Sequence, residues 1–243
     1  GQTVAAMANS QDGIITFSDG SKETVKTDAP ENISLTGWEL KVDSYEPGEK
    51  VIRTETNQDT GVTTTEVAYT TNHVEKDAGK LDKLIPWKEL PAVGEEVSGI
   101  GTYTNSFTLP SDWSDKDNGI DFQVKSLNGG TAAIWVNGER VPVNMERNSA
   151  DLTAYVKPGE NTISVRVTSS LRNVMIKQGY PSGWPFGAPT PDDYGMTGET
   201  TLVTYKKVQV KSATQKLSEA NQAVEDARKA ANEAEKKAEA AQK

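Results

Sequence analysis

The sequence predicts an all-β fold, an antiparallel jelly-roll β-sandwich followed by an α-helical tail. Residues 36–210 contain short runs in which apolar and polar side chains alternate, as along strands with one buried face. Gly, Pro and Asn turns separate these runs, and no helical periodicity lies between them. Residues 211–243 have neither Gly nor Pro and consist mostly of Ala, Glu, Lys and Gln, which is typical of a helix.

Residues 1–35 form the first predicted region. The run ITFSDGSKETV holds two alternating segments around Asp19-Gly20, a dipeptide that is typical of tight hairpin turns. We predict a β-hairpin that either ends a preceding domain or forms an edge of the sandwich. Because an apparent strand begins within a few residues of Gly1, we expect the chain to be a piece of a longer polypeptide.

The first strand of the main domain is predicted in WELKVDSY, where Trp38, Leu40 and Val42 share one face. Residues 46–78 are rich in Thr, Asp and Asn, and they are predicted to form a hairpin about Thr60-Gly61. This hairpin is expected to be an excursion from the core, since it offers few apolar side chains to bury.

The later strands follow the same alternation. In TYTNSFTL, GIDFQV and TISVRV the side chains expected to face inward are Tyr103, Phe107, Leu109, Ile120, Phe122, Val124, Ile163, Val165 and Val167. The run AAIWVNGERVPV predicts a hairpin with a type I′ turn at Asn137-Gly138, and TLVTYKKVQV closes the set. Asp151 is expected to cap a short turn. Trp38, Trp87 and Trp135 are predicted in the core or at the sandwich edge.

The tail carries a seven-residue repeat. One position of the repeat holds Leu217, Val224, Ala231 and Ala238, and the position three residues later holds Ala220, Ala227, Ala234 and Ala241. This is the a/d pattern of a coiled coil, but Ala buries little area in such a seam. Two interpretations follow: a solvated single helix or stalk, and a coiled coil formed within this chain or with a partner chain.

Composition excludes several classes of function. The net charge is -9, which argues against nucleic acid and against anionic membranes as partners. The chain has no Cys, so disulfides, thiol catalysis and Cys-ligated metals are excluded. The sequence contains neither a signal peptide nor an apolar run long enough to span a membrane.

Motifs between residues 96 and 170 resemble a known family. They are Gly101-Thr102-Tyr103, Phe107-Thr108-Leu109-Pro110, Trp113, Trp135-Val136-Asn137-Gly138, Asp151-Leu152-Thr153, Tyr155-Val156 and Gly159-Glu160-Asn161-Thr162. In this order they resemble the galactose-binding-like, sugar-binding jelly-roll domain of family 2-type glycoside hydrolases. The likeness extends more loosely back to Trp38 and forward through Tyr194-Gly195.

The resemblance implies a role for the chain. Such domains lie beside a catalytic barrel and are usually not catalytic themselves, and a barrel of about 250 residues would not fit in this chain. The overall likeness is to large multidomain glycosidases of Gram-positive bacteria, in which this domain lies toward the C-terminus and an Ala/Glu/Lys helix often leads to wall-attachment sequences. The resemblance therefore implies an extracellular protein, secreted or attached to the cell wall, with the neighbouring domains of the parent enzyme as partners.

A search for catalytic and metal motifs finds no strong candidate. The only histidine, His73, is expected to be an ordinary surface residue, and no pair of acidic residues stands in the setting of a glycosidase. Residues 111–119 are dense in oxygen ligands, but Lys116 interrupts them and the spacing of a calcium loop is missing. We expect a solvated turn there, with bound calcium as the alternative, and no other cofactor.

Residues 179–195 read GYPSGWPFGAPTPDDYG, and their prolines predict a loop. One interpretation is a carbohydrate site in which aromatic rings stack on sugar and polar neighbours bind its hydroxyls. Its candidate residues are Tyr180, Trp184, Phe186, Asp192, Arg172 and Asn173, with Arg147 and Asn148 facing them across one end of the sandwich. The other interpretation is that the aromatic residues pack over the sandwich edge or against a neighbouring domain.

The sequence thus favours a non-catalytic accessory module of a bacterial glycoside hydrolase, which binds carbohydrate or supports the catalytic domain. The alternative is a structural or adhesive module of a surface protein, whose partner is another protein.

Overall fold

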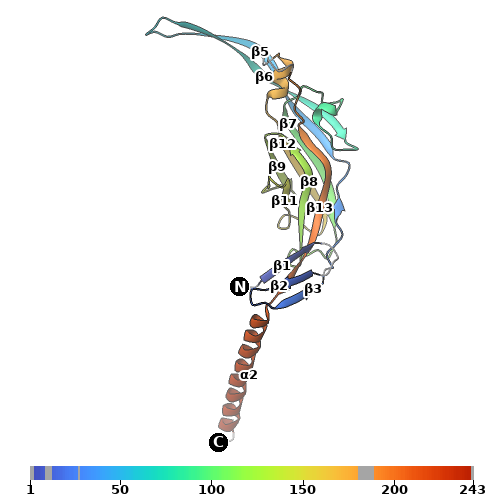
Figure 1. Cartoon of the computed structure of the whole chain (residues 1–243), viewed down its shortest axis with the longest axis vertical. Helices are drawn as coiled ribbons and strands as arrows, with labels where there is room; N and C mark the ends of the chain where they lie inside the picture. The colour runs from blue at the N-terminus through green and yellow to red at the C-terminus, as the bar shows by residue number, and fades with distance from the viewer. Residues whose placement is uncertain (1–2, 9–12, 27, 180–188, 242–243) are drawn as a thin grey trace. The chain divides into compact units, whose positions relative to one another are not determined.

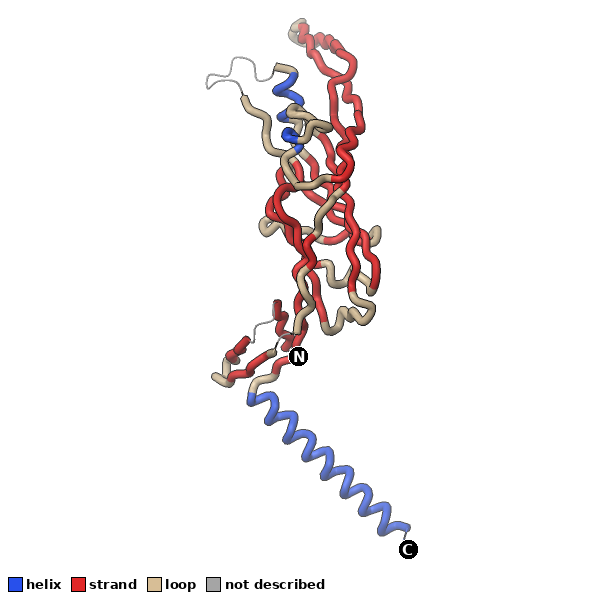
Figure 2. The backbone as a smooth tube through the Cα atoms, turned by 90° about the vertical axis from the view of Figure 1, so that its right-hand side faces the viewer, coloured by secondary structure: helices blue, strands red, loops and turns tan. Residues whose placement is uncertain are grey.

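A computed structural model describes residues 3–8, 13–26, 28–179 and 189–241, and the chain divides into two compact units. The larger unit comprises Asn32–Asp115 and Gly119–Thr204. The smaller unit comprises Gly1–Glu31, Lys116–Asn118 and Tyr205–Lys243. The described structure is mostly antiparallel strand with a C-terminal helix, which confirms the predicted fold class (Figure 2).

Two sheets make up the larger unit (Figure 1). The six-stranded sheet has the order β10 (Glu139–Val141), β9 (Thr131–Val136), β12 (Gly159–Thr168), β7 (Gly99–Leu109), β5 (Glu39–Thr56) and β6 (Thr63–Lys80). The facing sheet contains β4 (Ile33–Ser34), β11 (Ser149–Asp151), residues 119–128 of β8 (Asn118–Asn128) and residues 195–204 of β13 (Gly195–Val210).

The inward faces of these strands supply the core. All of the predicted inward side chains are buried, and the most completely enclosed include Trp38, Leu40, Val42, Tyr103, Ile120, Phe122, Ile163, Val165 and Val167. Alternation therefore identifies the buried face of each strand correctly, because successive side chains of a strand point to opposite sides.

The buried side chains of Trp87 and Tyr103 form a hydrogen-bonded pair next to the start of β13. The Trp87 indole N–H donates a hydrogen bond to the Tyr103 hydroxyl at 2.8 Å, and the Met196 N–H donates to the same oxygen at 3.0 Å. Burial raises the pKa of Tyr103 to about 12. A main-chain hydrogen bond adds to these contacts, because the Trp87 N–H donates to the Tyr194 carbonyl at 2.9 Å. Together these hydrogen bonds hold Tyr194-Gly195 in position where β13 begins.

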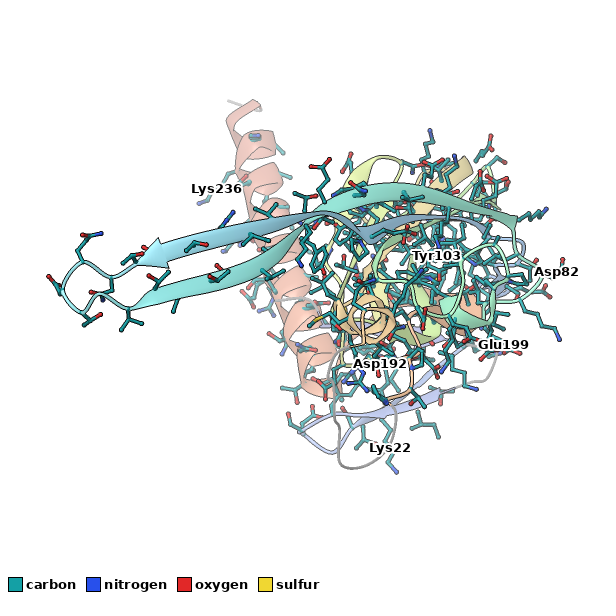
Figure 3. The ribbon with its side chains drawn as sticks, turned by 90° about the horizontal axis from the view of Figure 1, so that it is seen from above. Lys22, Asp82, Tyr103, Asp192, Glu199 and Lys236 are labelled. Atoms are coloured by element: carbon teal, nitrogen blue, oxygen red, sulfur yellow. The ribbon has the colours of Figure 1, made fainter. Side chains whose placement is uncertain are left out.

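Strands β5 and β6 continue beyond the sheet as a two-stranded arm (Figures 1 and 3). Strand β7 pairs with β5 only as far as Ser44, opposite Gly99, whereas β5 and β6 pair as far as Thr56 and Thr63. The turn at the tip lies within residues 57–62, around Thr60-Gly61 as predicted. The second predicted hairpin is also present, with positive φ angles of 51° at Asn137 and 87° at Gly138.

Two short helices interrupt the region that was predicted to contain only strands. The helix α1 (Arg172–Lys177) follows β12, and a single 3₁₀ turn, η1 (Trp87–Glu89), precedes β7. A helix of this length shows no readable periodicity and is unstable alone. Tertiary contacts form it here, since Asn173 and Val174 are buried and the Val174 N–H donates to the Ser98 hydroxyl at 3.2 Å.

The smaller unit combines strands with the tail helix. Strand β1 (Thr3–Ala8) pairs with residues 205–210 of β13, and β2 (Gly13–Thr16) pairs with β3 (Lys22–Val25) in the predicted hairpin. The helix α2 (Ala213–Ala241) confirms the predicted helical tail, and its side chains over residues 213–238 are exposed. Both interpretations of its repeat therefore stay predictions.

The β2–β3 hairpin caps the first turn of α2. The Thr214 hydroxyl and N–H donate to one carboxylate oxygen of Asp19 at 2.7 and 3.3 Å. The Ser21 hydroxyl donates to the other oxygen at 2.6 Å and accepts a bond from the Ala213 N–H at 3.1 Å. These bonds satisfy N–H groups that a helix start leaves without intrahelical partners.

The pKa of Asp19 is expected to lie below its usual range, chiefly because Ser21 donates to the ionised carboxylate. The cap therefore stabilises the folded state at neutral pH and is lost only as the pH falls through this lowered pKa. Replacing Ser21 by alanine should move the pKa back toward its usual value, as followed by NMR titration of the Asp19 side-chain carbon. An unchanged pKa in S21A would contradict the assigned cause.

Candidate functional site

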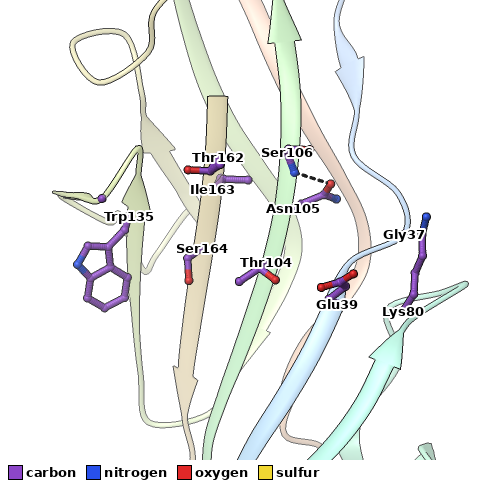
Figure 4. Close-up of a pocket in the computed structure, with 11 residues that line it drawn as sticks. Gly37, Glu39, Lys80, Thr104, Asn105, Ser106, Trp135, Thr162, Ile163 and Ser164 are labelled. Atoms are coloured by element: carbon purple, nitrogen blue, oxygen red, sulfur yellow. Dashed lines mark hydrogen bonds between the residues drawn. The ribbon is translucent and has the colours of Figure 1, made fainter. Parts of the chain in front are cut away.

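A row of side chains crosses the outer face of the six-stranded sheet. The strand register places Trp135 opposite Ser164, Ser164 opposite Thr104, Thr104 opposite Glu39, and Glu39 opposite Lys80. Each residue comes from a different strand, in the order β9, β12, β7, β5 and β6 (Figure 4). Directly opposite residues in a sheet lie about 5 Å apart, so the row forms one continuous surface.

The row lines a hollow of about 510 Å³ on this face. Above it in Figure 4 lie Ser106 and Thr162, which are opposite one another on β7 and β12. Asn105 closes this side, where its amide donates to the Thr36 carbonyl at 3.1 Å and its oxygen accepts from the Ser106 N–H at 2.8 Å. These bonds fix one wall of the hollow.

Trp135 is the aromatic residue of the hollow. It is half-buried on the outward face of β9, whereas its neighbours Ile134 and Val136 are fully buried in the core. Trp135 is therefore not a core residue, unlike Trp38 and Trp87. The Arg166 guanidinium lies 5.7 Å from the centre of the indole ring, but Arg166 does not line the hollow. This cation–π contact steadies the ring without filling the hollow.

The middle of the row is rich in hydroxyl groups. No hydrogen bond among the described residues engages the hydroxyls of Thr104 or Ser164. Both groups are therefore available to a ligand as donors and acceptors. Glu39 is the one acidic residue among the described residues that line the hollow. A glycosidase reaction uses two carboxylates across the sugar, and the described lining of this hollow offers one.

The structure brings together three residues of the predicted loop site. The Asn173 amide donates to the Asp192 carbonyl at 3.0 Å, and the Asp192 N–H donates to the Asn173 side-chain oxygen at 2.8 Å. The Arg172 guanidinium pairs with the Asp192 carboxylate at 3.1 Å. Asn173 is only 2% exposed, so its side chain serves to attach the chain near Asp192 to α1.

Further contacts tie the same segment to the larger unit. The Lys88 ammonium pairs with the Asp193 carboxylate at 2.6 Å, and this bond raises the pKa of Lys88. The Tyr194 hydroxyl lies 2.6 Å from the Ser170 hydroxyl, and its ring meets Trp87 edge-on. These contacts make the described end of the loop a packed connection.

Of the other predicted site residues, two lie apart from α1 and three lie outside the described residues. Arg147 lines a hollow with Gln123 and Lys125, and the Asn148 amide donates to the Lys125 carbonyl at 3.3 Å. These residues lie next to β11, well apart from α1 in Figure 1, so they do not face Arg172 and Asn173. The predicted stacking residues Tyr180, Trp184 and Phe186 lie outside the described residues.

The single histidine has a partner that the sequence did not suggest. The His73 ring nitrogen Nδ1 lies 2.9 Å from an Asp43 oxygen across the β5–β6 pair, and the ring packs 4.7 Å from that of Tyr45. Among the described residues, no group of three His, Asp or Glu side chains could hold a metal ion. Calcium at residues 111–119 stays a prediction.

Fold and site together define an all-β sandwich with an aromatic and hydroxyl-rich hollow on one outer sheet face. No known protein-family model matches the chain. Over 91 residues, 34% of the chain, it is 34% identical to a β-galactosidase of Priestia megaterium, of which it covers 8%. Part of the chain is thus similar in sequence to part of a glycoside hydrolase, and the chain spans a small fraction of that relative.

Two solved structures are similar to part of the chain. A rhamnosidase from Novosphingobium sp. PP1Y gives a TM-score of 0.45 at 19% identity, covering 72% of this chain and 15% of that one. An FMN-binding β-glucuronidase from Faecalibacterium prausnitzii gives a TM-score of 0.40 at 17% identity, covering 72% of this chain and 22% of that one.

Within the described part of the chain, no helix is both long and apolar enough to cross a membrane.

Proposed function

We propose that the chain is a non-catalytic, carbohydrate-binding accessory module of a secreted or cell-surface bacterial glycoside hydrolase. The observation that carries this proposal is the row from Trp135 to Lys80 on the outer sheet face. The partial similarity to a β-galactosidase supports a glycoside hydrolase as the parent enzyme. The chain covers only 8% of that relative, which supports its being one module of a larger enzyme. Its other partners would be the neighbouring domains of that enzyme.

The chemistry of the hollow matches that of a sugar. A pyranose ring offers an apolar face, which packs on an indole, and a rim of hydroxyls, which bind to hydroxyl and charged side chains. Trp135 supplies the first element, and Ser164, Thr104 and Glu39 supply the second for the sugar residues that lie along the row. The sheet holds all four on a rigid scaffold, so little ordering is needed on binding.

Replacing Trp135 by alanine is expected to weaken glycan binding about tenfold or more. An aromatic contact of ~1.5 kcal/mol corresponds to roughly this factor in affinity. Binding would be measured first on a glycan array with the full chain and then by calorimetry with the retained glycan. Tyr69→Ala is the matched control, because Tyr69 is 54% exposed on the arm and does not line the hollow.

Retention of no glycan by the unaltered chain would overturn the proposal, and equal binding by W135A and the unaltered chain would overturn the assignment of the site to the row. The predicted loop is a second location for sugar binding on the same module. A loss of binding in Trp184→Ala but not in W135A would move the site to that loop.

A second function, docking to another protein, is favoured by exposed apolar side chains on the arm and α1. Ile52, Val67 and Tyr69 are 61%, 50% and 54% exposed. Tyr69 also lines a groove of about 430 Å³ with Leu171 and Met175 of the adjoining helix segment. Exposed apolar groups in one area are typical of protein contacts. This function corresponds to the adhesive or structural module that the sequence left as the alternative.

A further inference from the structure

We propose that the hollow binds a neutral oligosaccharide chain laid across the strands, and not a single terminal sugar. This inference rests on the proposed function, and it adds the length, direction and charge class of the ligand. The supporting features are the span of the row, the change in its chemistry from end to end, and the position of Lys80.

The row is longer than a single sugar. Trp135 and Lys80 are its ends, and three strands lie between their strands β9 and β6. Neighbouring strands lie ~4.8 Å apart, so the row is about 19 Å long. This length is several times the width of one pyranose ring. A single sugar stacked on Trp135 would leave Glu39 and Lys80 without contact.

The chemistry of the row changes from one end to the other. The aromatic ring stands at one end, the free hydroxyls of Ser164 and Thr104 in the middle, and the two charged residues Glu39 and Lys80 at the other end. Each part of the row can bind either sugar hydroxyls or the face of a sugar ring. Successive sugar residues of one oligosaccharide would therefore meet successive side chains of the row. Every strand crossed contributes one side chain to this path.

Lys80 is held in place at the far end of the row. Gly37 lies against it, and a Cβ atom at position 37 would overlap the Lys80 side-chain carbon Cε. Gly37 also has a φ of 69°, which side chains other than Gly rarely adopt. The absence of a side chain there lets the Lys80 stem lie along the sheet. Its ammonium lies beside Gly37, which also lines the hollow.

The charges of the hollow favour a neutral ligand. Glu39 and Lys80 are opposite neighbours of unlike sign, and both line the hollow. Their charges offset one another, so the hollow attracts neither strongly acidic nor strongly basic glycans. Both groups still form strong hydrogen bonds to sugar hydroxyls, because one partner in each bond is charged.

The test is calorimetry of the full chain with neutral β-linked galacto-oligosaccharides, from monosaccharide to hexasaccharide. The same series would be made for the neutral glycan that the array retains best. We expect affinity to rise with each added residue until the row is filled. Lys80→Ala should lower the affinity for the longest chain about tenfold and leave that for the disaccharide unchanged. Trp135→Ala should lower the affinity at every length.

Lys41→Ala is the matched control. Lys41 lies on the same face, next to the row, where it pairs with Glu75 at 3.1 Å and does not line the hollow. Its replacement should change no affinity in the series. Equal affinity for monosaccharide and hexasaccharide would overturn this inference and leave the proposed function standing, as would an equal effect of K80A at every length. Absence of binding at any length and on the array would overturn both.

Discussion

Replacing Gly195 by alanine is expected to lower the free energy of unfolding of the larger unit by about 3 kcal/mol or more. Gly195 has a φ of 110°, so any side chain there strains the backbone. A Cβ atom would also lie 2.5 Å from both the Trp87 indole nitrogen and the Tyr103 hydroxyl oxygen. Both side chains are fully buried and hydrogen-bonded to each other, so neither can move aside cheaply.

Urea denaturation of G195A and the unaltered chain would measure this effect. Gly159→Ala is the matched control, because Gly159 has a φ of 82° but no atom within 4 Å of the added Cβ. Backbone strain alone should therefore cost about 1 kcal/mol in G159A. Equal losses in the two variants would show that the contact with Trp87 and Tyr103 contributes nothing.

Replacing Asn161 by alanine is expected to lower the free energy of unfolding by about 3 kcal/mol. Asn161 is 0% exposed. Its oxygen accepts bonds from the Asn137 amide at 2.8 Å and the Lys157 N–H at 2.9 Å. Its amide donates to the carbonyls of Lys157 and Gly159 at 2.8 and 2.9 Å. Alanine would remove all four bonds, which join this buried side chain to partly buried groups of the two turns.

The control for N161A is Asn144→Ala. Asn144 is exposed, and its oxygen accepts one bond from the Arg147 N–H at 3.0 Å. Water can replace that bond, so the expected loss is within about 1 kcal/mol. A loss in N161A no larger than that in N144A would contradict the structural role given to the Asn161 bonds.

These two positions explain why parts of the recognised sequence pattern exist. Gly159-Glu160-Asn161-Thr162 and Tyr194-Gly195 were identified by resemblance, and no rule of alternation or turn formation required Asn161 or Gly195. In the structure Asn161 links the turn before β12 to the β9–β10 turn, and Gly195 makes room for Trp87 and Tyr103. Both reasons are contacts between segments that are distant in sequence.

The candidate sites differ in how far the sequence could lead to them. The sequence placed Arg172, Asn173 and Asp192 near one another, and the structure does bring them together. Their bonds to each other could not be predicted, since they depend on the helix α1, which only tertiary contacts form. Trp135 was missed, although a signal existed: Ile134 and Val136 face the core, so a residue between them must face outward.

The sequence by itself determined the class of fold, the buried face of each strand, the hairpins at Asp19-Gly20, Thr60-Gly61 and Asn137-Gly138, and the helical tail. Each of these depends on neighbours within a few residues. Only the tertiary structure decided which strands pair and in which register. The row from Trp135 to Lys80 exists because five strands from separate parts of the chain align at one level. A period of two fixes the side of the sheet on which a residue lies, but not the residue that lies beside it.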